Sequence, residues 1–336
     1  MTKYYIKRTL FGASLILGLL VIIYLLVYIA PGNPAYVWAG RPRGPKAVEA
    51  IKQAEKELGL DQPLYVQIAL LTARFLTGDW GVSIAFKQPV LAVVARSFKA
   101  TIELLTLSYI LAIPLGLMLG IFTALRRGSS IDMVLKITSS IFISIPRFWF
   151  ALILVLVFYL AGLQPLGRID PRFSIEIKEV TGFYTVDSAL TFRLDILLDV
   201  LVRLTPPALV IAVYPLFSIA RYVRYSLSER FYEDYVMEAI SLGISRQAIL
   251  ARYALRGTIP AVVQLAGMNF VYSFVEAAVV EIIFMREGVG RILLEGLLRS
   301  DYPLIVAVFF VVSLTLVIVN TATDVIQKKL DPRVKI

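Results

Sequence analysis

The chain has 336 residues, of which 58% are hydrophobic and 17% are charged, and its formal net charge is +10. This composition is far from that of soluble proteins and places the chain in a lipid bilayer. The absence of Cys and His excludes thiol nucleophiles, disulfides, histidine-based triads and most zinc, copper and haem sites. The cations lie beside apolar runs, which is typical of membrane topology rather than of nucleic-acid binding.

Six apolar runs are long enough to cross a bilayer core, which takes about 20 helical residues. The first follows Lys3, Lys7 and Arg8 and lacks the small-residue pattern of a cleavage site, so we expect a retained anchor. Thr101 and Asp301 are the expected N-caps of the second and sixth spans. The six runs lie at residues 9–30, 100–125, 134–162, 201–224, 261–284 and 303–325.

Lys and Arg gather on one side of this predicted topology. If the N-terminus is cytoplasmic, the inner segments and their flanks carry sixteen cations, whereas the short outer segment 285–302 carries three. Cationic side chains are retained on the cytoplasmic side of membranes. We therefore expect an all-α integral membrane protein with six transmembrane helices and with both termini in the cytoplasm.

The predicted organisation has four parts. A cytoplasmic tail and the first span occupy residues 1–30, and residues 31–99 form an extracytoplasmic region of short helices. One of these helices ends at Gly59, and Pro89 opens another. A core of five spans occupies residues 100–325 and includes a cytoplasmic loop, 225–260, and a short cytoplasmic tail follows at 326–336.

The cytoplasmic loop is predicted to form two short helices, at residues 231–242 and 246–257. Ala239 and Gly243 are four residues apart, so we expect one helix face with little bulk that another body can approach. Gly243 suits a left-handed turn, Ser245 can cap the second helix, and Pro260 marks the start of span five. An apolar face on the second helix needs either a protein partner or the underside of the bundle. Its residues are Ile249, Leu250, Tyr253 and Ala254.

At these residues the chain resembles a known family. Glu238-Ala239, three further residues and then Gly243 look like the EAA-type motif of ABC importer permeases. Eight further segments resemble the dipeptide/oligopeptide branch of that family, so the resemblance covers essentially the whole chain. They are APGNP after span one, ELGLDQPLYVQ at 57–67, LTGDWGVSI at 76–84, ALRRGSSID at 124–132, SIPRFW at 144–149, GVGR at 288–291, DYP at 301–303 and LDPRVK at 330–335. The chain departs from the usual pattern at Arg147, Tyr253, Gly257 and Glu287.

The resemblance implies a type I ABC importer permease in a prokaryotic plasma membrane. It implies a second homologous permease, two cytoplasmic ATPase subunits or domains and an extracytoplasmic substrate-binding protein as partners, besides the lipid bilayer. The helix pair would be the element that couples the permease to the ATPase, with Arg246 and Arg252 as candidates for contacts to the ATPase or lipid. The residues implied to shape it are Glu238, Ala239, Gly243 and Ser245.

No P-loop pattern occurs in the sequence, so we expect ATP and Mg to bind in the partner ATPase subunits and not in this chain. We expect a transport subunit without catalytic residues, cofactor or metal. The resemblance implies di- or oligopeptides as cargo, with oligosaccharides or nickel chelates as alternatives. The rival class is an ion-coupled secondary transporter or channel.

Charged residues within the spans are costly and therefore candidates for function. Arg147 lies near the middle of span three, Glu276 near the middle of span five, and Glu281 nearer the outside. Arg147 and Glu276 either line the passage and meet polar substrate groups, or pair with each other, with the partner permease or with water. Gly116 and Gly120 are four apart in span two and predict close helix packing.

Overall fold

The computed structural model describes residues 42–330 together with residues 12, 14, 17, 18, 21, 22, 25, 35, 36, 39 and 40. The predicted span 9–30 and the last residues of the C-terminal tail therefore lie largely outside the described residues. The described residues divide into two compact units, one drawn from Met1–Thr101 and Glu287–Ile318 and the other from Ile102–Arg286 and Val319–Ile336. Helices α5 (Val90–Leu125) and α14 (Tyr302–Leu330) contribute residues to both units.

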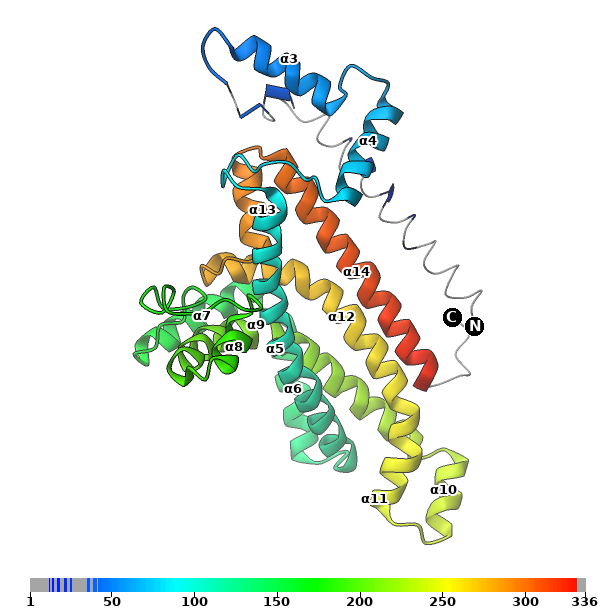
Figure 1. The fold of residues 1–336 in the computed structure, drawn as a ribbon. Coiled ribbons are helices and arrows are strands. Elements are labelled where there is room, and N and C mark those ends of the chain that lie inside the picture. Colours follow the sequence, from blue (N-terminus) through cyan, green and yellow to red (C-terminus); the bar gives the residue numbers. More distant parts are fainter. Residues whose placement is uncertain are drawn as a thin grey trace. The chain divides into compact units, whose positions relative to one another are not determined.

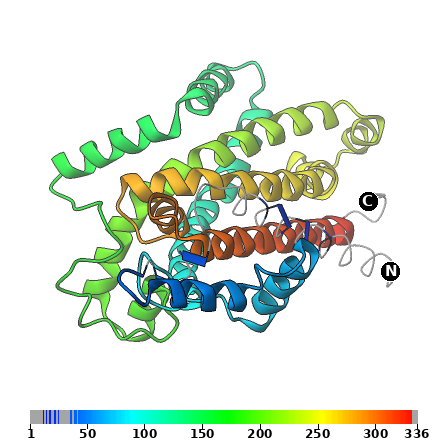
Figure 2. The same ribbon diagram turned by 90° about the horizontal axis from the view of Figure 1, so that it is seen from above.

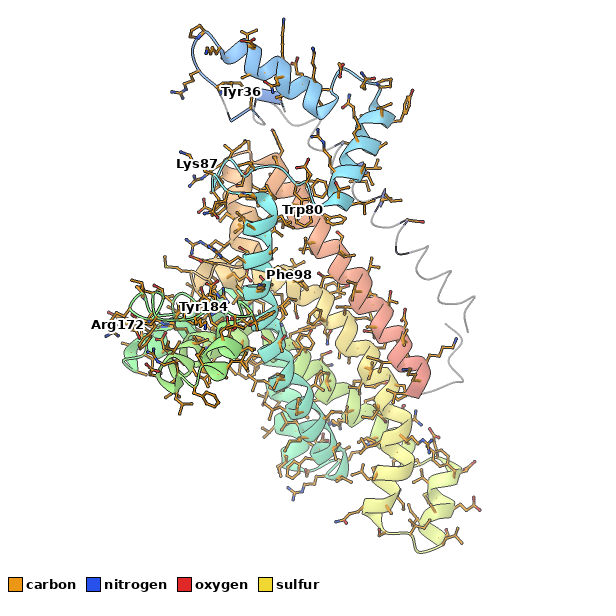
Figure 3. The ribbon with its side chains drawn as sticks, viewed as in Figure 1. Tyr36, Trp80, Lys87, Phe98, Arg172 and Tyr184 are labelled. Atoms are coloured by element: carbon orange, nitrogen blue, oxygen red, sulfur yellow. The ribbon has the colours of Figure 1, made fainter. Side chains whose placement is uncertain are left out.

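The first unit contains α3 (Ala47–Leu58), α4 (Leu64–Thr77), α13 (Val289–Leu298) and the first parts of α5 and α14. Its apolar core joins Phe75 of α4 to side chains of α5, α13 and α14. Trp80, labelled in Figure 3, stacks on Phe75 with ring centroids 5.6 Å apart and meets Phe310 edge-on. Gly59 ends α3 at φ 65°, as predicted.

The two predicted N-caps have different outcomes. Asp301 is fully buried before α14, where its carboxylate accepts from the backbone N–H of Leu304 at 3.3 Å and from the hydroxyl of Ser83 at 2.5 Å, so this cap is confirmed. Thr101 as a cap is wrong, because α5 begins at Val90, directly after Pro89. The helix starts early because Val90, Val93 and Val94 pack into the core of the first unit.

The second unit contains α6 (Ser130–Ser144), α7 (Arg147–Leu160), α8 (Tyr184–Leu190), α9 (Leu194–Arg230) and α12 (Leu255–Ile283), with the remainder of α5 and α14. Helix α9 is its centre, since it packs against α6, α7, α8 and α12. Figures 1 and 2 show α9 and α12 running side by side. Ile219, Val223 and Leu227 of α9 are buried against Ala124 and Val262.

Glycine allows α5 to approach α9 closely, as the four-residue spacing predicted. A Cβ atom added at Gly116 would lie 2.8 Å from the carbonyl oxygen of Leu216. A Cβ atom at Gly120 would lie 2.7 Å from Cβ of Val223 and 2.8 Å from the carbonyl oxygen of Ala220. Real Cβ atoms do not come this close to backbone, so only glycine fits both positions without moving a helix.

The predicted third span is not one straight helix. Helices α6 and α7 are apolar enough to cross a membrane as a pair but bend by 101° at the break between them. The break falls at Ile145 and Pro146, where proline lacks a donor N–H and pushes Ile145 into an extended conformation at ψ 126°. Within the described residues, four helices qualify as spans alone, namely α5, α9, α12 and α14, or five if the bent pair is one span.

Pro260 does not begin the fifth span. Helix α11 (Arg246–Ile249) passes into a π-helical turn, Leu250–Ala254, and then directly into α12, which runs from Leu255 through Pro260. The predicted second cytoplasmic helix is therefore the first part of a continuous helical run into the span. In the described residues the one β feature is an isolated bridge between Val82 and Pro89.

Candidate functional site

A short helix and a tight turn form one end of the second unit. Helix α10 (Asp234–Ser241) and helix α11 lie beyond the ends of α9 and α12 (Figure 1). Gly243 joins them at φ 73°, the left-handed conformation predicted for it. The hydroxyl of Ser245 accepts from the backbone N–H of Ala248 at 3.4 Å, so Ser245 caps α11 as predicted.

The packing inside this helix pair contradicts the prediction that Ala239 and Gly243 form an open helix face. Val236 and Ala239 of α10 are buried against Ile249 of α11, with Phe231 and Ile244 around them. Ala239 therefore packs inside the pair and is not open to another body. Gly243 lies after the end of α10, so the two residues do not share a helix face. An added Cβ at Gly243 would meet no atom within 4 Å, which makes its backbone conformation the reason for glycine.

Large apolar side chains are nevertheless exposed on α10 and directly beside it. Leu242 is 73% exposed, and Tyr232, Met237 and Ile240 are also exposed large hydrophobic residues. Glu238 is exposed beside them. Several exposed large apolar side chains in one short segment make it a candidate interaction surface. The side chains of Arg246 and Arg252 lie outside the part of the chain that the structure describes.

Arg230 ties the helix pair to the two long helices, a role that we did not predict from the sequence. This last residue of α9 donates from Nη2 to the carbonyl oxygen of Gly257 at 2.9 Å and from Nη1 to the hydroxyl of Tyr235 at 3.5 Å. A side chain at Gly257 would collide with the guanidinium group. Arg230 and Gly257 are 27 residues apart in the sequence. The glycine at position 257 was the one feature of the sequence that could have indicated this contact.

A cavity of about 340 Å³ separates α10 from the ends of α5 and α9. Its walls include Arg127, whose guanidinium lies 5.7 Å from the ring centre of Tyr232. Met237 and Ile240 form the opposite wall. Helix α10 is therefore held against α11 by Val236 and Ala239, and a cavity remains between α10 and the ends of α5 and α9.

Arg147 and Glu276 are brought together inside the bundle. Nε of Arg147 donates to Oε1 of Glu276 at 3.1 Å, and the two side chains are 12% and 25% exposed. Nη1 of Arg147 also donates to the carbonyl oxygens of Phe142 and Ile145, at 3.2 and 3.4 Å. Those carbonyls belong to the last turn of α6 and its cap, groups that lack partners within the helix. Arg147 thus contacts the end of α6 across the break before α7 and joins this break to α12 through Glu276.

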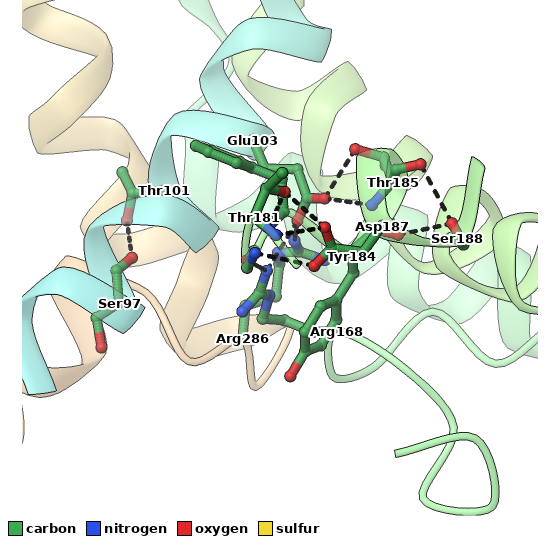
Figure 4. Close-up of polar contacts among 12 residues, drawn as sticks. Ser97, Thr101, Glu103, Arg168, Thr181, Tyr184, Thr185, Asp187, Ser188 and Arg286 are labelled. Atoms are coloured by element: carbon green, nitrogen blue, oxygen red, sulfur yellow. Dashed lines mark hydrogen bonds and ion pairs between the residues drawn. The ribbon is translucent and has the colours of Figure 1, made fainter. Parts of the chain in front are cut away.

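Glu281 belongs to a different cluster, shown in part in Figure 4. Glu281 is 1% exposed and acts electrostatically on the buried guanidinium of Arg286. Burial lowers the pKa of Arg286 to about 10, although the negative charge of Glu103 acts to raise it. Glu103 accepts from Arg168 at 3.1 Å and from the backbone N–H and hydroxyl of Thr185 at 2.8 and 2.9 Å. These contacts fasten the segment between α7 and α9 to α5. The structure therefore separates Glu281 from the Arg147–Glu276 pair with which the sequence grouped it.

Comparisons with known proteins cover the whole chain. Residues 116–336 match the family described as binding-protein-dependent transport system inner membrane component, and residues 1–105 match the N-terminal family of such membrane components. A dipeptide transport system permease protein of Alkalihalophilus pseudofirmus is 29% identical over 100% of both chains. A probable D,D-dipeptide transport system permease protein of Escherichia coli K12 is 32% identical over 98% of this chain and 96% of its own length.

A di/tripeptide transport system permease protein of Pseudomonas aeruginosa is also 32% identical, over 95% of this chain and 94% of its own length. Both the family match and these relatives extend through the helix pair at α10 and α11 and through the broken span at α6 and α7. The chain therefore belongs to the family of binding-protein-dependent transport system inner membrane components.

Proposed function

We propose that this chain is the permease subunit of an ATP-driven importer and forms, with a second homologous permease, the path by which di- or oligopeptides cross the membrane. The chain is a multi-pass plasma-membrane protein of a transport system. The proposal adds two cytoplasmic ATPase subunits or domains and an extracytoplasmic binding protein as partners. ATP and Mg act in those ATPase subunits, and this chain contributes neither catalytic residues nor a cofactor site.

The exposed apolar surface of α10 is the observation that carries this proposal. It lies at the end of the second unit, where lipid does not cover it in the proposed orientation, and Arg230 links it to both α9 and α12. A force applied to α10 is therefore transmitted to the ends of two long helices. In this scheme the ATPase binds Leu242 at the end of α10, with the exposed Glu238 one turn before it.

The coupling residues then divide by role. Ala239 holds the helix pair together from inside, and Gly243 and Ser245 set the turn between its helices. Arg246 and Arg252 stay candidates for contacts to the ATPase or to lipid headgroups.

A substitution at Gly243 tests the coupling role. Gly243→Val forces a β-branched residue into a left-handed conformation, which costs about 1–2 kcal/mol, and it displaces α10 relative to α11. We expect normal membrane insertion but loss of ATPase association and of ATP-driven uptake in reconstituted vesicles. Gly162→Val is the matched control, because Gly162 has φ 77° and open space around it but lies after α7. Substrate-stimulated hydrolysis and uptake at wild-type level in Gly243→Val would count against the coupling role.

We propose that the Arg147–Glu276 pair is a joint beside the translocation path and not an open charged site for substrate. Each charge already has a partner, and Arg147 also serves two carbonyl oxygens of the broken span. Contact with a charged substrate group requires this pair to separate. Glu281 is assigned to the outer cluster with Arg286.

The rival secondary transporter requires an ion relay through Arg147, Glu276 and Glu281. Such a carrier works as a purified chain under an ion gradient, whereas the proposed importer needs its ATPase and ATP. Uptake by vesicles that contain this chain alone, driven by a proton or sodium gradient, would support the rival.

The peptide cargo rests on the names of the relatives, which are transport system permeases for dipeptides, D,D-dipeptides and di/tripeptides. Oligosaccharides and nickel chelates stay as alternatives. A binding screen of the partner binding protein against short peptides, oligosaccharides and nickel chelates decides among these three classes.

We further propose six transmembrane helices with both termini in the cytoplasm. The natural absence of Cys allows a direct test with single-cysteine variants. Ser174→Cys lies in the loop before α8 and Ser241→Cys at the end of α10, and both residues are exposed. A membrane-impermeant maleimide added outside intact cells should label Ser174→Cys alone, and labelling of Ser241→Cys under those conditions would reverse the topology.

A further inference from the structure

A second cavity, of about 440 Å³, opens between α6 and α9 and has an unusual set of walls. Three of its lining residues are cations, namely Lys136, Arg221 and Arg224, and two are tyrosines, Tyr222 and Tyr225. Leu135 completes the lining. The volume lies within the range of small-molecule sites, about 300–1,000 Å³.

The carboxylates near the cavity neutralise only part of this charge. Asp132 holds Arg224 through two hydrogen bonds, one of them 2.8 Å long, and also pairs with Lys136 at 3.2 Å. Glu229 lies beside the hydroxyl of Tyr225. Against three cations there are thus two carboxylates, and one positive charge remains in excess. Among the described residues, the exposed Arg221 forms no ion pair.

The position of the cavity along the predicted span four corresponds to the membrane surface. Arg221, Arg224 and Tyr225 lie at the end of the apolar run 201–224 predicted as span four, on the side where α10 and α11 follow α9. Tyrosine is enriched at the boundary between hydrocarbon and water, and cations there meet the phosphates of the inner leaflet.

We infer that the cavity between α6 and α9 binds the phosphodiester headgroup of an anionic phospholipid, with Arg221 and Lys136 on the phosphate. A phosphodiester carries one negative charge, which balances the single positive charge in excess. The guanidinium of Arg221 can grip two phosphate oxygens at once, whereas the ammonium of Lys136 acts as a point charge. Arg224 supports the site indirectly by holding Asp132. The site goes beyond the transport function and rests only on the proposed membrane orientation.

The test measures lipid retention by the full-length chain in nanodiscs of phosphatidylcholine with a minor fraction of phosphatidylglycerol. We compare wild type, Arg221→Gln, Lys136→Gln and the double variant, and we leave Arg224 intact because it secures Asp132. A cation near an anionic surface is worth about fivefold in binding, so we expect about fivefold weaker phosphatidylglycerol retention for each single variant and about 25-fold for the double.

Arg126→Gln is the matched control. Arg126 lies near the same end of the second unit, but its guanidinium rests over the ring of Phe122 at 4.1 Å and does not line the cavity. Retention that is unchanged in the double variant, or lowered equally in Arg126→Gln, overturns the site. If the two substitutions weaken the binding of inorganic phosphate but leave phosphatidylglycerol retention unchanged, the ligand is a free anion and the lipid assignment is overturned.

A partner protein is the remaining occupant. If ATPase association falls in Arg221→Gln while phosphatidylglycerol retention is unchanged, the cavity is a protein contact and the lipid site is refuted. ATP-driven uptake is measured in parallel, so a failure of the transport proposal is recognised separately from a failure of lipid binding.

Discussion

The ion pair at the broken span makes a quantitative prediction about stability. At 3.1 Å and an effective dielectric constant of about 20, the attraction between Arg147 and Glu276 is about 5 kcal/mol before desolvation is subtracted. Desolvation offsets most of this for side chains that are 12% and 25% exposed. We therefore expect a net coupling of about 1–3 kcal/mol between the two residues.

A double-mutant cycle isolates that coupling. Glu276→Gln should lower the free energy of unfolding by about 2–4 kcal/mol, because it leaves the guanidinium without its counter-ion. Arg147→Gln should cost about 1 kcal/mol more, because the hydrogen bonds to the carbonyls of Phe142 and Ile145 are lost as well. The double variant should cost less than the sum of the two single variants, and the difference is the coupling of about 1–3 kcal/mol.

The assay is unfolding of the purified chain by SDS titration in mixed micelles, followed by circular dichroism. Phe148→Leu serves as the control, since it changes an exposed neighbour that lies outside the pair. Additive losses in the double variant would refute direct pairing. Charge reversal, Arg147→Glu with Glu276→Arg, should restore less than the full transport activity, because a carboxylate at position 147 cannot donate to the two carbonyls.

Three further predictions follow from the fold. Gly120→Leu should separate α5 from α9 and destabilise the chain by about 1–3 kcal/mol in the same SDS titration. Met118→Leu, on the exposed side of α5, is the control and should not change the stability. Equal stability of both variants would contradict the close packing of α5 on α9. Arg230→Gln should uncouple ATP hydrolysis from uptake while the chain stays folded, because α10 loses its link to Gly257. Substitution of the exposed Arg256, Arg256→Gln, is the control. Coupled uptake in Arg230→Gln would exclude the linking role. Hydrogen bonds from the side chain and backbone N–H of Arg172 lower the pKa of Asp170 to about 2. The ionised carboxylate therefore stabilises its loop at pH above about 4, and this stabilisation is lost as the pH falls toward 2. Pepsin cleavage of the loop should rise as the pH falls through this window in wild type, whereas cleavage of Asp170→Asn should not depend on pH.

Local chemistry was readable from the sequence because it depends on few neighbouring residues. The left-handed turn at Gly243, the cap at Ser245 and the end of α3 at Gly59 each follow from the conformational freedom of glycine or from a hydroxyl one turn from its donor. The apolar runs at α5, α9, α12 and α14 follow from the need of a spanning helix to satisfy its own backbone. The spacing of Gly116 and Gly120 also predicted close packing, although not which helix would fill the space.

Helix ends were less readable, because tertiary packing overrides local signals there. Thr101 has the chemistry of an N-cap, yet α5 begins at Val90 because the preceding valines are buried in the core of the first unit. Pro260 has the chemistry of a helix start, yet the helix reaches it from Leu255. Ala239 reads as a bare surface in sequence but is covered by Ile249 across the turn.

The charged residues show most clearly what each level determined. The sequence by itself determined that Arg147, Glu276 and Glu281 lie in or beside apolar spans and therefore need partners or water, because an isolated charge there is costly. Only the tertiary structure decided the partners: Arg147 meets Glu276 across 129 residues at the 101° bend, and Glu281 acts on Arg286 in another cluster. The physical reason is that burial cost is a property of one residue and its segment, whereas a salt bridge depends on where the bend at Pro146 and the packing of α12 place both ends.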